Sequence, residues 1–586
     1  LDGLGREEQT IVMNATPGGQ DWVSTTEYCD KRHVSRQWMP AVMQTEGQRM
    51  DVTDIRSQAQ SNYEDSRPYS ESSYENSVRK RPISQVRQGN SYQSSPATQT
   101  YSLNSENDLV RIYSVVDSSL QTEGVNYNEA TLYKNTITDE DGKSVSTYTD
   151  KQGKKIMEER GGKRIYYVYD DMERLRYILP HAAQSKLTNG IYNLNHVVLR
   201  ADAYCYNYDD RGNLIYKRLP GCEPQYMVYD QLGQLILKQD GNQRAKGKWT
   251  LCAYDSIGRN LYIAEIPLEQ SHVFYVTFYA DKWAVEHYGN NHSFPITGTG
   301  YASQLLGKTD LQPLIINYYD DYSFLNLLST PVRQALRFVQ ESGYGTQHDN
   351  ATGLLTGRRI YNLSDEEYVQ TAYYYDTHGQ IVQSRSTRHT DGYAVTSTKY
   401  HFDGSIAQQL TTQGTDSNLV REHYRYTYDH AGRLTETHYR LNNDEEITLS
   451  AFSYDSIGRL VQNLLHQNKD AIRYSYDIRN MLTELHNRHF SERLFYADSV
   501  SAFVGASPNY NGNIAVSRAT NADTAFVFTY AYDTQNRLTA ASQLTGYGSF
   551  FSEQLTYDDA GNILTFKRFN NNRTIDDLSY DYGNEG

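Results

Sequence analysis

The sequence predicts an all-β fold, a large spiralling sheet assembled from repeated β-hairpins, and three observations support this prediction. First, residues 426–434 (Tyr-Thr-Tyr-Asp-His-Ala-Gly-Arg-Leu) recur in close copies along the chain. Second, the copies at 428, 454 and 476 follow one another at a nearly fixed step, which is typical of stacked or spiralling repeat arrays. Third, the hydrophobic share of 38% includes 53 tyrosines, so aliphatic residues are scarce for the length of the chain. Because tyrosine is amphipathic, we expect a thin or hollow β structure rather than a large solid core.

Each copy has the pattern of one β-hairpin. Aromatic residues two positions apart, such as Tyr426 and Tyr428, point to the same face of an extended strand. An Asp at the first position and a Gly at the fourth position predict a type I turn whose last residue has a positive φ, and the Asp side chain can accept bonds from backbone amides of the turn. Asn480 and Asn536 replace Gly in two copies, and Asn tolerates a positive φ better than most residues. The Leu or Ile after the turn begins the returning strand.

The Tyr, Asp and Gly of the repeats are the residues that we predict to form the structural motif. They are Tyr208, Asp209, Gly212, Tyr229, Asp230, Gly233, Tyr254, Asp255, Gly258, Tyr375, Asp376, Gly379, Tyr428, Asp429, Gly432, Tyr454, Asp455, Gly458, Tyr476, Asp477, Tyr532, Asp533, Tyr557, Asp558 and Gly561. Incomplete copies begin at Tyr28, Tyr148, Tyr169, Tyr400 and Tyr580.

The repeats divide the chain into five regions. We predict degenerate repeats in 1–52, a polar Ser- and Tyr-rich irregular β segment in 53–147, repeats in 148–260, an insertion with a short helix in 261–370, and repeats again in 371–586. The composition of the second region leaves a disordered linker as the alternative. Since the chain begins and ends inside repeat-like segments, we expect it to be a fragment of a longer protein.

Three local patterns carry their own predictions. Glu173 stands at the glycine position of its repeat, so that turn should differ from the others or be strained. Asn189-Gly190 between apolar residues predicts a separate two-residue hairpin. In the insertion, Thr330 can cap a short helix that Pro331 opens.

Charge and cysteine content exclude several classes of function. The chain has 56 basic and 71 acidic residues, a net charge of −15, which disfavours nucleic acids and anionic membrane surfaces as partners. No apolar run approaches the length of a membrane span. Cys29, Cys205, Cys222 and Cys252 lack metal-ligand spacing and are too few for a disulfide framework, so we interpret them as structural thiols.

The sequence contains no catalytic or cofactor motif that survives inspection. Residues 298–303 (Gly-Thr-Gly-Tyr-Ala-Ser) lack the third glycine of a dinucleotide loop, and neither a Gly-x-Ser-x-Gly elbow nor a phosphate-binding loop occurs. His287 and His292 lie near Glu286 but not at the spacing of a zinc helix. We therefore predict no enzyme activity, no metal and no cofactor.

Two features of the repeats themselves could be mistaken for binding or catalytic sites. The repeat aspartates could be imagined as paired acids for glycoside hydrolysis, but turn formation already explains their position. The arginines after the turns, Arg259, Arg433, Arg459 and Arg537, could form an anion-binding stripe, but we expect them to pair with acidic residues on neighbouring strands.

The series of Tyr-Asp-x-x-Gly-Arg-Leu units resembles the RHS, or YD-repeat, family over about two thirds of the chain. The opening segment 2–10 and the aromatic runs at 318–322 and 373–376 resemble RHS proteins of Bacteroides-type bacteria. The resemblance implies a hollow cocoon, as in insecticidal toxin complexes, interbacterial polymorphic toxins and teneurins, that encloses a C-terminal toxin. It also implies a secreted or cell-surface bacterial protein. The Asp-Pro-x-Gly motif of the family's self-cleaving centre is absent here, so no residue is assigned to autoproteolysis.

Two functional hypotheses follow. In the first, the chain is a shell segment that encapsulates and delivers its own downstream C-terminal effector polypeptide. In the second, it is an adhesin whose aromatic repeats bind cell-surface glycans, because rings exposed on a solenoid can stack on sugars. The scarcity of tryptophan, with 4 in the chain, favours the first hypothesis.

Overall fold

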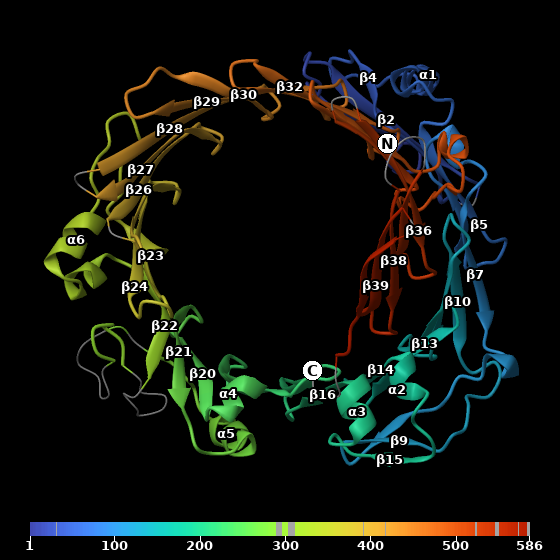
Figure 1. Ribbon diagram of the computed structural model, residues 1–586, viewed down its shortest axis with the longest axis horizontal. Helices are drawn as coiled ribbons and strands as arrows, with labels where there is room; N and C mark the ends of the chain where they lie inside the picture. Colours follow the sequence, from blue (N-terminus) through green and yellow to red (C-terminus); the bar gives the residue numbers. More distant parts are fainter. Residues whose placement is uncertain are drawn as a thin grey trace. The chain divides into compact units, whose positions relative to one another are not determined.

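The chain folds into one extensive antiparallel β-sheet (Figure 1). The computed structural model describes residues 1–30, 32–286, 288, 296–302, 311–390, 392–415, 418–521, 524–544, 550–571 and 573–582. Within these residues, 37 strands belong to the large sheet and three to a second, small sheet. This confirms the predicted all-β repeat array. The chain divides into unit 1, residues 1–198, 428–436 and 450–586, and unit 2, residues 199–427 and 437–449.

The first part of unit 1 contains twelve sequential strands of the large sheet. They are β1 (Gln9–Val12), β2 (Asp21–Tyr28), β3 (Val34–Trp38), β4 (Ala41–Met43), β5 (Tyr69–Tyr74), β6 (Pro82–Val86), β7 (Ala97–Leu103), β10 (Tyr133–Thr138), β11 (Ser144–Thr149), β12 (Lys155–Arg160), β13 (Lys163–Tyr169) and β14 (Leu175–Leu179). The small sheet contains β8 (Ser114–Val116), β9 (Ser119–Thr122) and β15 (Gly190–Tyr192).

The second part of unit 1 consists almost entirely of hairpins. Its strands are β31 (Leu460–Leu465), β32 (Asp470–Tyr476), β33 (Leu482–His486), β34 (Phe490–Phe495), β35 (Val516–Asn521), β36 (Thr524–Tyr532), β37 (Leu538–Gln543), β38 (Phe551–Tyr557), β39 (Ile563–Asn570) and β40 (Arg573–Ser579). Each pairs antiparallel with the next. Three strands contain residues of both units: β28 (Asn418–Tyr428), β29 (Leu434–Leu441) and β30 (Ile447–Tyr454).

In its described residues, unit 2 contains twelve strands and four helices. The strands are β16 (Tyr204–Tyr208), β17 (Leu214–Arg218), β18 (Gln225–Tyr229), β19 (Leu235–Gln239), β20 (Lys248–Tyr254), β21 (Asn260–Pro267), β22 (Gln312–Asp320), β23 (Ala351–Tyr361), β24 (Tyr368–Tyr375), β25 (Ile381–Thr387), β26 (Tyr393–Tyr400) and β27 (Ile406–Thr415). The helices are most of α3 (Val197–Asp202), α4 (Gly241–Ala245), α5 (His272–Tyr279) and α6 (Thr330–Leu336).

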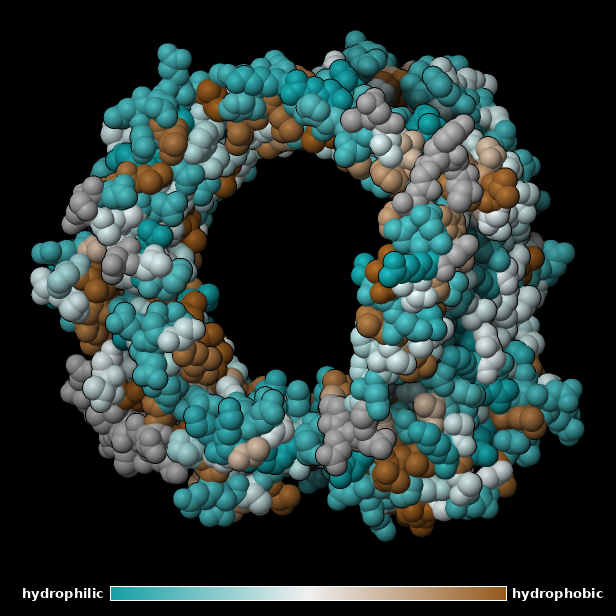
Figure 2. Space-filling model, in the orientation of Figure 1, coloured by the Kyte–Doolittle hydropathy of each residue, from teal (hydrophilic) through white to brown (hydrophobic). Residues whose placement is uncertain are grey.

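Unit 2 contains a large hydrophobic core, and here the expectation of a thin wall was wrong. Strands β18 to β22, β24 and β25 share one buried cluster that includes Trp249, Leu251 and Tyr374. Helix α5 contributes Tyr275 and Tyr279 to this cluster, because residues four apart lie on one helix face. The low aliphatic content of the whole chain hid this local concentration. Elsewhere, apolar residues are scattered over the visible face rather than gathered in one patch (Figure 2).

Helix α1 (Val52–Tyr63) in unit 1 was not predicted. Asp51 caps its first turn by accepting a bond of 2.7 Å from the Thr53 amide, and Ile55 and Ala59 are buried against Val23 and its neighbours. The signal was present in the sequence: a capping Asp followed by apolar residues four apart. The polar tyrosine-rich region that follows contains strands β5, β6, β7 and β10 of the large sheet.

The region predicted as an insertion continues the sheet instead of interrupting it. Strands β21, β22, β23 and β24 pair in sequence, so the period breaks in the sequence but not in the strand order. Helix α6 begins at Thr330 with Pro331 in its first turn, and the capping position is Ser329 rather than Thr330. The hairpin predicted at Asn189-Gly190 is absent, because Gly190 instead begins β15 and pairs with β9.

Candidate functional site: the repeat turns

The repeat turn at Asp455 shows the geometry that its residues produce. The Gly458 amide donates to the Asp455 carbonyl oxygen at 3.0 Å, and the Asp455 amide donates to the Arg459 carbonyl oxygen at 2.9 Å. The Asp455 carboxylate accepts from the Ile457 and Arg459 amides at 3.1 and 2.9 Å. Gly458 has a φ of 82°, as the turn requires. One carboxylate thus satisfies two backbone donors at the tip of the hairpin.

The same geometry occurs at the other predicted turns. The amides at the Gly or Asn position bond to the carbonyl oxygens of Asp209, Asp230, Asp255, Asp376, Asp429, Asp477, Asp533 and Asp558. Positive φ angles are found at Gly212, Gly233, Gly258, Gly379, Gly432, Gly561, Asn480 and Asn536. A register shift falls at Tyr208, Tyr229, Tyr254, Tyr375, Tyr454, Tyr476, Tyr532 and Tyr557, so each of these tyrosines lies at a bulge before its turn.

Glu173 adopts the glycine conformation despite its side chain. Its φ is 65°, and the Asp170 turn keeps the bonds of the other repeats, including 2.9 Å from the Glu173 amide to the Asp170 carbonyl oxygen. Of the two alternatives that the sequence offered, the strained turn is the one observed. Lys154 forms an ion pair of 2.8 Å with Glu173.

At Arg433, Arg459 and Arg537 the arginine after the turn binds its own aspartate. The expected pairing with an acid on a neighbouring strand is found at Arg259, which binds Asp320 at the end of β22. The Nε atom of Arg459 lies 2.7 Å from Asp455 Oδ2, because a tight turn places residues i and i+4 on the same side. A second donor reaches the next repeat: Arg459 Nη1 bonds to the Asp477 carbonyl oxygen at 3.0 Å. Arg537 repeats this arrangement with Asp533. Arg459 and Arg537 therefore link consecutive turns.

The motif tyrosines link consecutive hairpins through their hydroxyl groups. In six described repeats the hydroxyl donates to a backbone carbonyl oxygen on the preceding hairpin or strand, at 2.6 to 3.1 Å. The pairs are Tyr254 with Leu235, Tyr375 with Leu355, Tyr454 with Leu434, Tyr476 with Leu460, Tyr532 with Ile514 and Tyr557 with Leu538. Burial raises the pKa of Tyr254 and of Tyr375 to about 12, so both remain protonated donors at neutral pH. The period of the tyrosines predicted the strand face but not this bond.

Some turns of this type escaped the sequence prediction. Asp139 and Gly142 form one without a motif tyrosine, and the pattern Asp-x-x-Gly alone would have revealed it. In the degenerate copy at Tyr28, the turn begins at Cys29 and not at Asp30, because the Arg32 amide bonds to the Cys29 carbonyl oxygen at 2.8 Å. At the end of the chain, Tyr582 takes the linking position and bonds to the Ile563 carbonyl oxygen at 3.0 Å. The last copy is therefore centred on Tyr582, two residues later than predicted.

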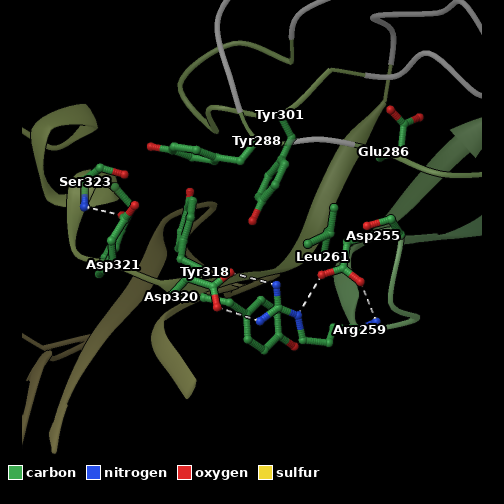
Figure 3. Close-up of a pocket in the computed structure, with 13 residues that line it drawn as sticks. Asp255, Arg259, Leu261, Glu286, Tyr288, Tyr301, Tyr318, Asp320, Asp321 and Ser323 are labelled. Carbon is green, nitrogen blue, oxygen red and sulfur yellow. Dashed lines mark hydrogen bonds and ion pairs between the residues drawn. The ribbon is translucent and has the colours of Figure 1, made fainter. Parts of the chain in front are cut away.

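A cavity of about 250 Å³ in unit 2 lies where the repeat pattern changes (Figure 3). Arg259 crosses its floor and binds Asp255 at 2.6 Å through Nε and Asp320 at 2.9 and 2.8 Å through both Nη atoms. In the regular repeats this arginine reaches a carbonyl oxygen of the next turn. Here Asp320, with a φ of 74°, supplies a carboxylate instead.

Charged and phenolic groups of this cavity are held in ion pairs and hydrogen bonds to other parts of unit 2. The hydrogen bonds from Arg259 hold the pKa of the Asp320 carboxyl below its usual range, and the same pairing raises the pKa of Arg259. The hydroxyls of Tyr301 and Tyr318 bond to the carbonyl oxygens of Asn317 and Thr299 at 2.6 and 2.9 Å. These bonds hold the irregular strand β22 against the regular hairpin of β20 and β21. The bonded carboxylate, guanidinium and phenol groups offer no activated nucleophile.

The glycine loop and the histidines considered in the sequence analysis are not part of a binding site in the described residues. Gly298 and Gly300 lie in a turn, with φ angles of 71° and 78°. His287 and His292 lie outside the described residues. Among the residues that the structure describes, no three His, Cys, Asp or Glu side chains form a metal-binding group, and no helix is long and apolar enough to cross a bilayer.

The fold and the turns define a class of protein: a continuous β-sheet whose hairpins are joined by tyrosine hydroxyls and arginine bridges. Comparisons with known proteins agree with this class. Residues 1–105 match the family model described as a domain of unknown function, DUF6443. A search of curated proteins gave no match.

Solved structures of toxin-complex proteins have the same fold. TcdB2–TccC3 without its hypervariable C-terminal region aligns over 97% of this chain with a TM-score of 0.60 and 14% identity. TcdB2–TccC3–Cdc42 aligns over 98% with a TM-score of 0.57 and 13% identity. The Tc holotoxin pore of Photorhabdus luminescens aligns over 97% with a TM-score of 0.58 and 13% identity. This chain covers 25%, 25% and 24% of those chains, so it spans about a quarter of their length. The likeness confirms the predicted fold, a long antiparallel β-sheet assembled from hairpins.

Proposed function

We propose that this chain is a shell segment that encloses a downstream effector polypeptide of the same protein. The observation that carries the proposal is the continuous hairpin array, joined turn to turn, with the fold of the toxin-complex chains. Among those chains, TcdB2–TccC3 has a hypervariable C-terminal region. A C-terminal effector in a longer form of this protein is the corresponding cargo.

The composition of the second part of unit 1 supports a wall rather than a globule. Strands β31, β32, β33 and β34 contain no fully buried residue, yet they carry tyrosine and leucine at regular positions. A sheet of this kind gives two water-accessible faces with half-exposed apolar side chains. Such a face suits a flexible polypeptide better than a small polar ligand.

The glycan-binding alternative has less support. In an adhesin of this type, rings must be free to stack on sugars. Here the motif tyrosines are engaged through their hydroxyls, and Tyr374 and Tyr375 are largely buried. The proposal has three further parts. The protein is an RHS protein of the Bacteroides type, it is secreted or displayed on the cell surface, and it acts in competition between bacteria.

Limited proteolysis of the natural full-length protein, combined with electron microscopy, tests this function. The expected result is a hollow particle in which the polypeptide beyond the repeats resists protease until the shell is denatured. A particle without an internal cavity, or a C-terminal polypeptide that is cleaved as fast as it is when expressed alone, would refute the proposal. A glycan array with the same protein tests the alternative: strong binding that is lost on single repeat Tyr→Ala changes favours the adhesin.

A further inference from the structure

Two parts of unit 1 that are distant in sequence lie against each other. Hydrogen bonds join residues of the first part, Trp22, Tyr92 and Lys143, to turn residues of the second part, Ser456, Asp477 and Asn536, and the two parts occupy the same region of the molecule in Figure 1. We call residues 1–163 the arm, and its contacts with the turns and loops of residues 428–562 the seam. The registers described for the arm strands β1 to β7 and β10 to β12 pair them with one another and with β13.

At one end of the seam, an indole and a guanidinium hold the arm. Trp22 Nε1 donates to the Ser456 carbonyl oxygen at 2.8 Å, and its ring lies 3.0 Å from where a Cβ on Gly458 would stand. Arg433 Nη1 donates to the Ala15 carbonyl oxygen at 2.8 Å. Both bonds use repeat-turn residues that sequence reasoning assigned only to the hairpins.

In the middle, a tyrosine replaces the usual arginine. Met481 stands at the arginine position of the Asp477 turn, and the Tyr92 hydroxyl of the arm donates to Asp477 Oδ2 at 3.3 Å instead. The Arg479 guanidinium lies 4.4 Å from the centre of the Tyr92 ring. Ile478 fills the space beside Gly89, where a Cβ would come within 2.7 Å of its methyl group. The Asp477 Oδ2 atom of this turn therefore receives its donor from the arm.

At the other end, polar contacts dominate. The Tyr510 amide donates to the Asp141 carboxylate at 2.6 Å, and Lys143 Nζ donates to Asn536 Oδ1 at 2.8 Å. Lys163 forms an ion pair of 2.5 Å with Asp559. A Cβ on Gly161 would collide with the Thr534 hydroxyl, whereas one on the adjacent Gly162 would meet nothing.

The seam is weak compared with the sheets that it joins. Each of its hydrogen bonds exchanges for a bond to water when it breaks and so contributes little net free energy, and a surface ion pair such as Lys163–Asp559 contributes less still. Within each sheet, in contrast, continuous backbone ladders must break together. The Tyr92 ring is buried and packs against Tyr510, but the other contacts named above are mostly polar. Contacts with few buried apolar groups are the ones that open first in native proteins.

We propose that the seam is a releasable joint: the arm separates from the repeat turns while the strand ladders on both sides remain intact. At this joint, the side chains of the turn residues Ile478 and Thr534 pack against the arm where Gly89 and Gly161 leave space. The joint goes beyond the shell function, because it requires only the contacts within unit 1.

Hydrogen exchange measured by NMR or by mass spectrometry of the intact chain tests the joint. The Tyr510 amide, whose acceptor is Asp141 on the arm, reports on the seam, and the amides of β36 report on the ladder. We expect at least about tenfold lower protection for Tyr510 than for β36, with a weaker dependence on urea, as for a local opening. Equal protection and equal urea dependence would overturn the proposal.

A matched pair of glycine variants separates the joint from general strain. Gly161→Ala and Gly162→Ala both place alanine at a positive φ, 56° and 76°, but only the first meets Thr534. We expect Gly161→Ala to lower the protection of Tyr510 by about tenfold more than Gly162→Ala does, while β36 protection changes equally in both. If the two variants have the same effect on Tyr510, the joint does not exist. Ile478→Glu with the exposed Ile257→Glu as its control gives a second, independent comparison, in which only Ile478→Glu should expose Tyr510.

Discussion

Strands β18 to β25 of unit 2 and strands β31 to β34 of unit 1 are built from the same hairpin but treat its faces differently. In unit 2, helices α5 and α6 and irregular segments cover one face, and Leu251, Trp249 and Ile236 are fully buried. In β31 to β34, every residue keeps some exposure to water. The comparison teaches that the repeat motif determines the hairpin and its turn, while inserted segments decide whether the hairpin gains a core.

Truncating one leucine in each region should give the largest difference. We expect Leu251→Ala to lower the free energy of unfolding of its region by about 2–5 kcal/mol, because it leaves a cavity in a closed core. Leu464→Ala, on the uncovered strands, should cost about 1 kcal/mol, because water already reaches that side chain. Urea denaturation followed by hydrogen exchange measures both. Equal losses would show that the uncovered sheet is covered in solution.

Removing a turn aspartate should show the same contrast on a smaller scale. Asp230 is fully buried and accepts bonds from the Leu232, Gln234 and Ala284 amides, so Asp230→Ala should cost about 2–3 kcal/mol. Asp558→Ala, in an exposed turn, should lower the free energy of unfolding by about 1 kcal/mol, because water can replace the carboxylate as acceptor. Thermal unfolding of the two variants ranks them. A larger loss at Asp558 would contradict the role given to burial.

Deleting single tyrosine hydroxyls should weaken the array modestly. Tyr375→Phe leaves the Leu355 carbonyl oxygen without its donor in a largely buried place, and we expect a cost of about 1–1.5 kcal/mol. Tyr476→Phe, beside a more exposed Leu460 carbonyl oxygen, should cost about 0.5 kcal/mol. Denaturation midpoints decide the order of the two. If neither variant differs from wild type, the hydroxyl bonds do not contribute to joining the hairpins.

Relieving the strained turn should stabilise the protein. Glu173→Gly removes a side chain at a φ of 65° at the expense of the ion pair with Lys154, and we expect a net gain of about 0.5 kcal/mol. Glu173→Ala is the matched control, because it removes the ion pair without relieving the positive φ. A stabilised Glu173→Ala would indicate that the charge, not the backbone, is unfavourable there.

The smallest effect concerns pH and has opposite signs at two turns. At Asp533, burial alone would raise the pKa of the carboxyl, but the backbone and side-chain bonds from Arg537 outweigh it and lower the pKa. Its contribution to stability is present above the unfolded pKa and is lost as the pH falls through the lowered folded value. At Asp477, burial raises the pKa despite the bonds that the carboxylate accepts. Its contribution is present below the unfolded pKa of about 3.9 and is lost as the pH rises through the raised folded value.

Asn variants make the two signs measurable. Asp533→Asn and Asp477→Asn each remove one titration, so the difference in unfolding free energy between each variant and wild type isolates that group. Between about pH 3 and pH 6, this difference should grow with pH in favour of wild type at Asp533 and shrink at Asp477. Slopes of the same sign at both positions would contradict the assignment.

Local motifs in this chain were predictable because their causes lie within a few residues. The Asp and Gly positions fixed the turns, and Asn480 and Asn536 correctly identified positive φ angles. The predicted pairing of these arginines with acids on neighbouring strands holds at Arg259, which binds Asp320 of β22. It fails at Arg459, whose guanidinium binds its own Asp455 and a carbonyl oxygen of the next turn. Helix α1 had a readable signal at Asp51 that the tyrosine-rich composition around it obscured.

By itself, the sequence determined the hairpin, its turn chemistry and the order in which hairpins follow one another, since each turn is closed by bonds among five consecutive residues. Only the tertiary structure decided which hairpins are covered by helices, which carbonyl oxygens receive the tyrosine hydroxyls, and where the arm meets the repeat turns. The physical reason is distance along the chain. A turn bond forms wherever its residues occur. Tyr92, in contrast, reaches Asp477 across 385 positions only after the arm and the repeat hairpins have both folded.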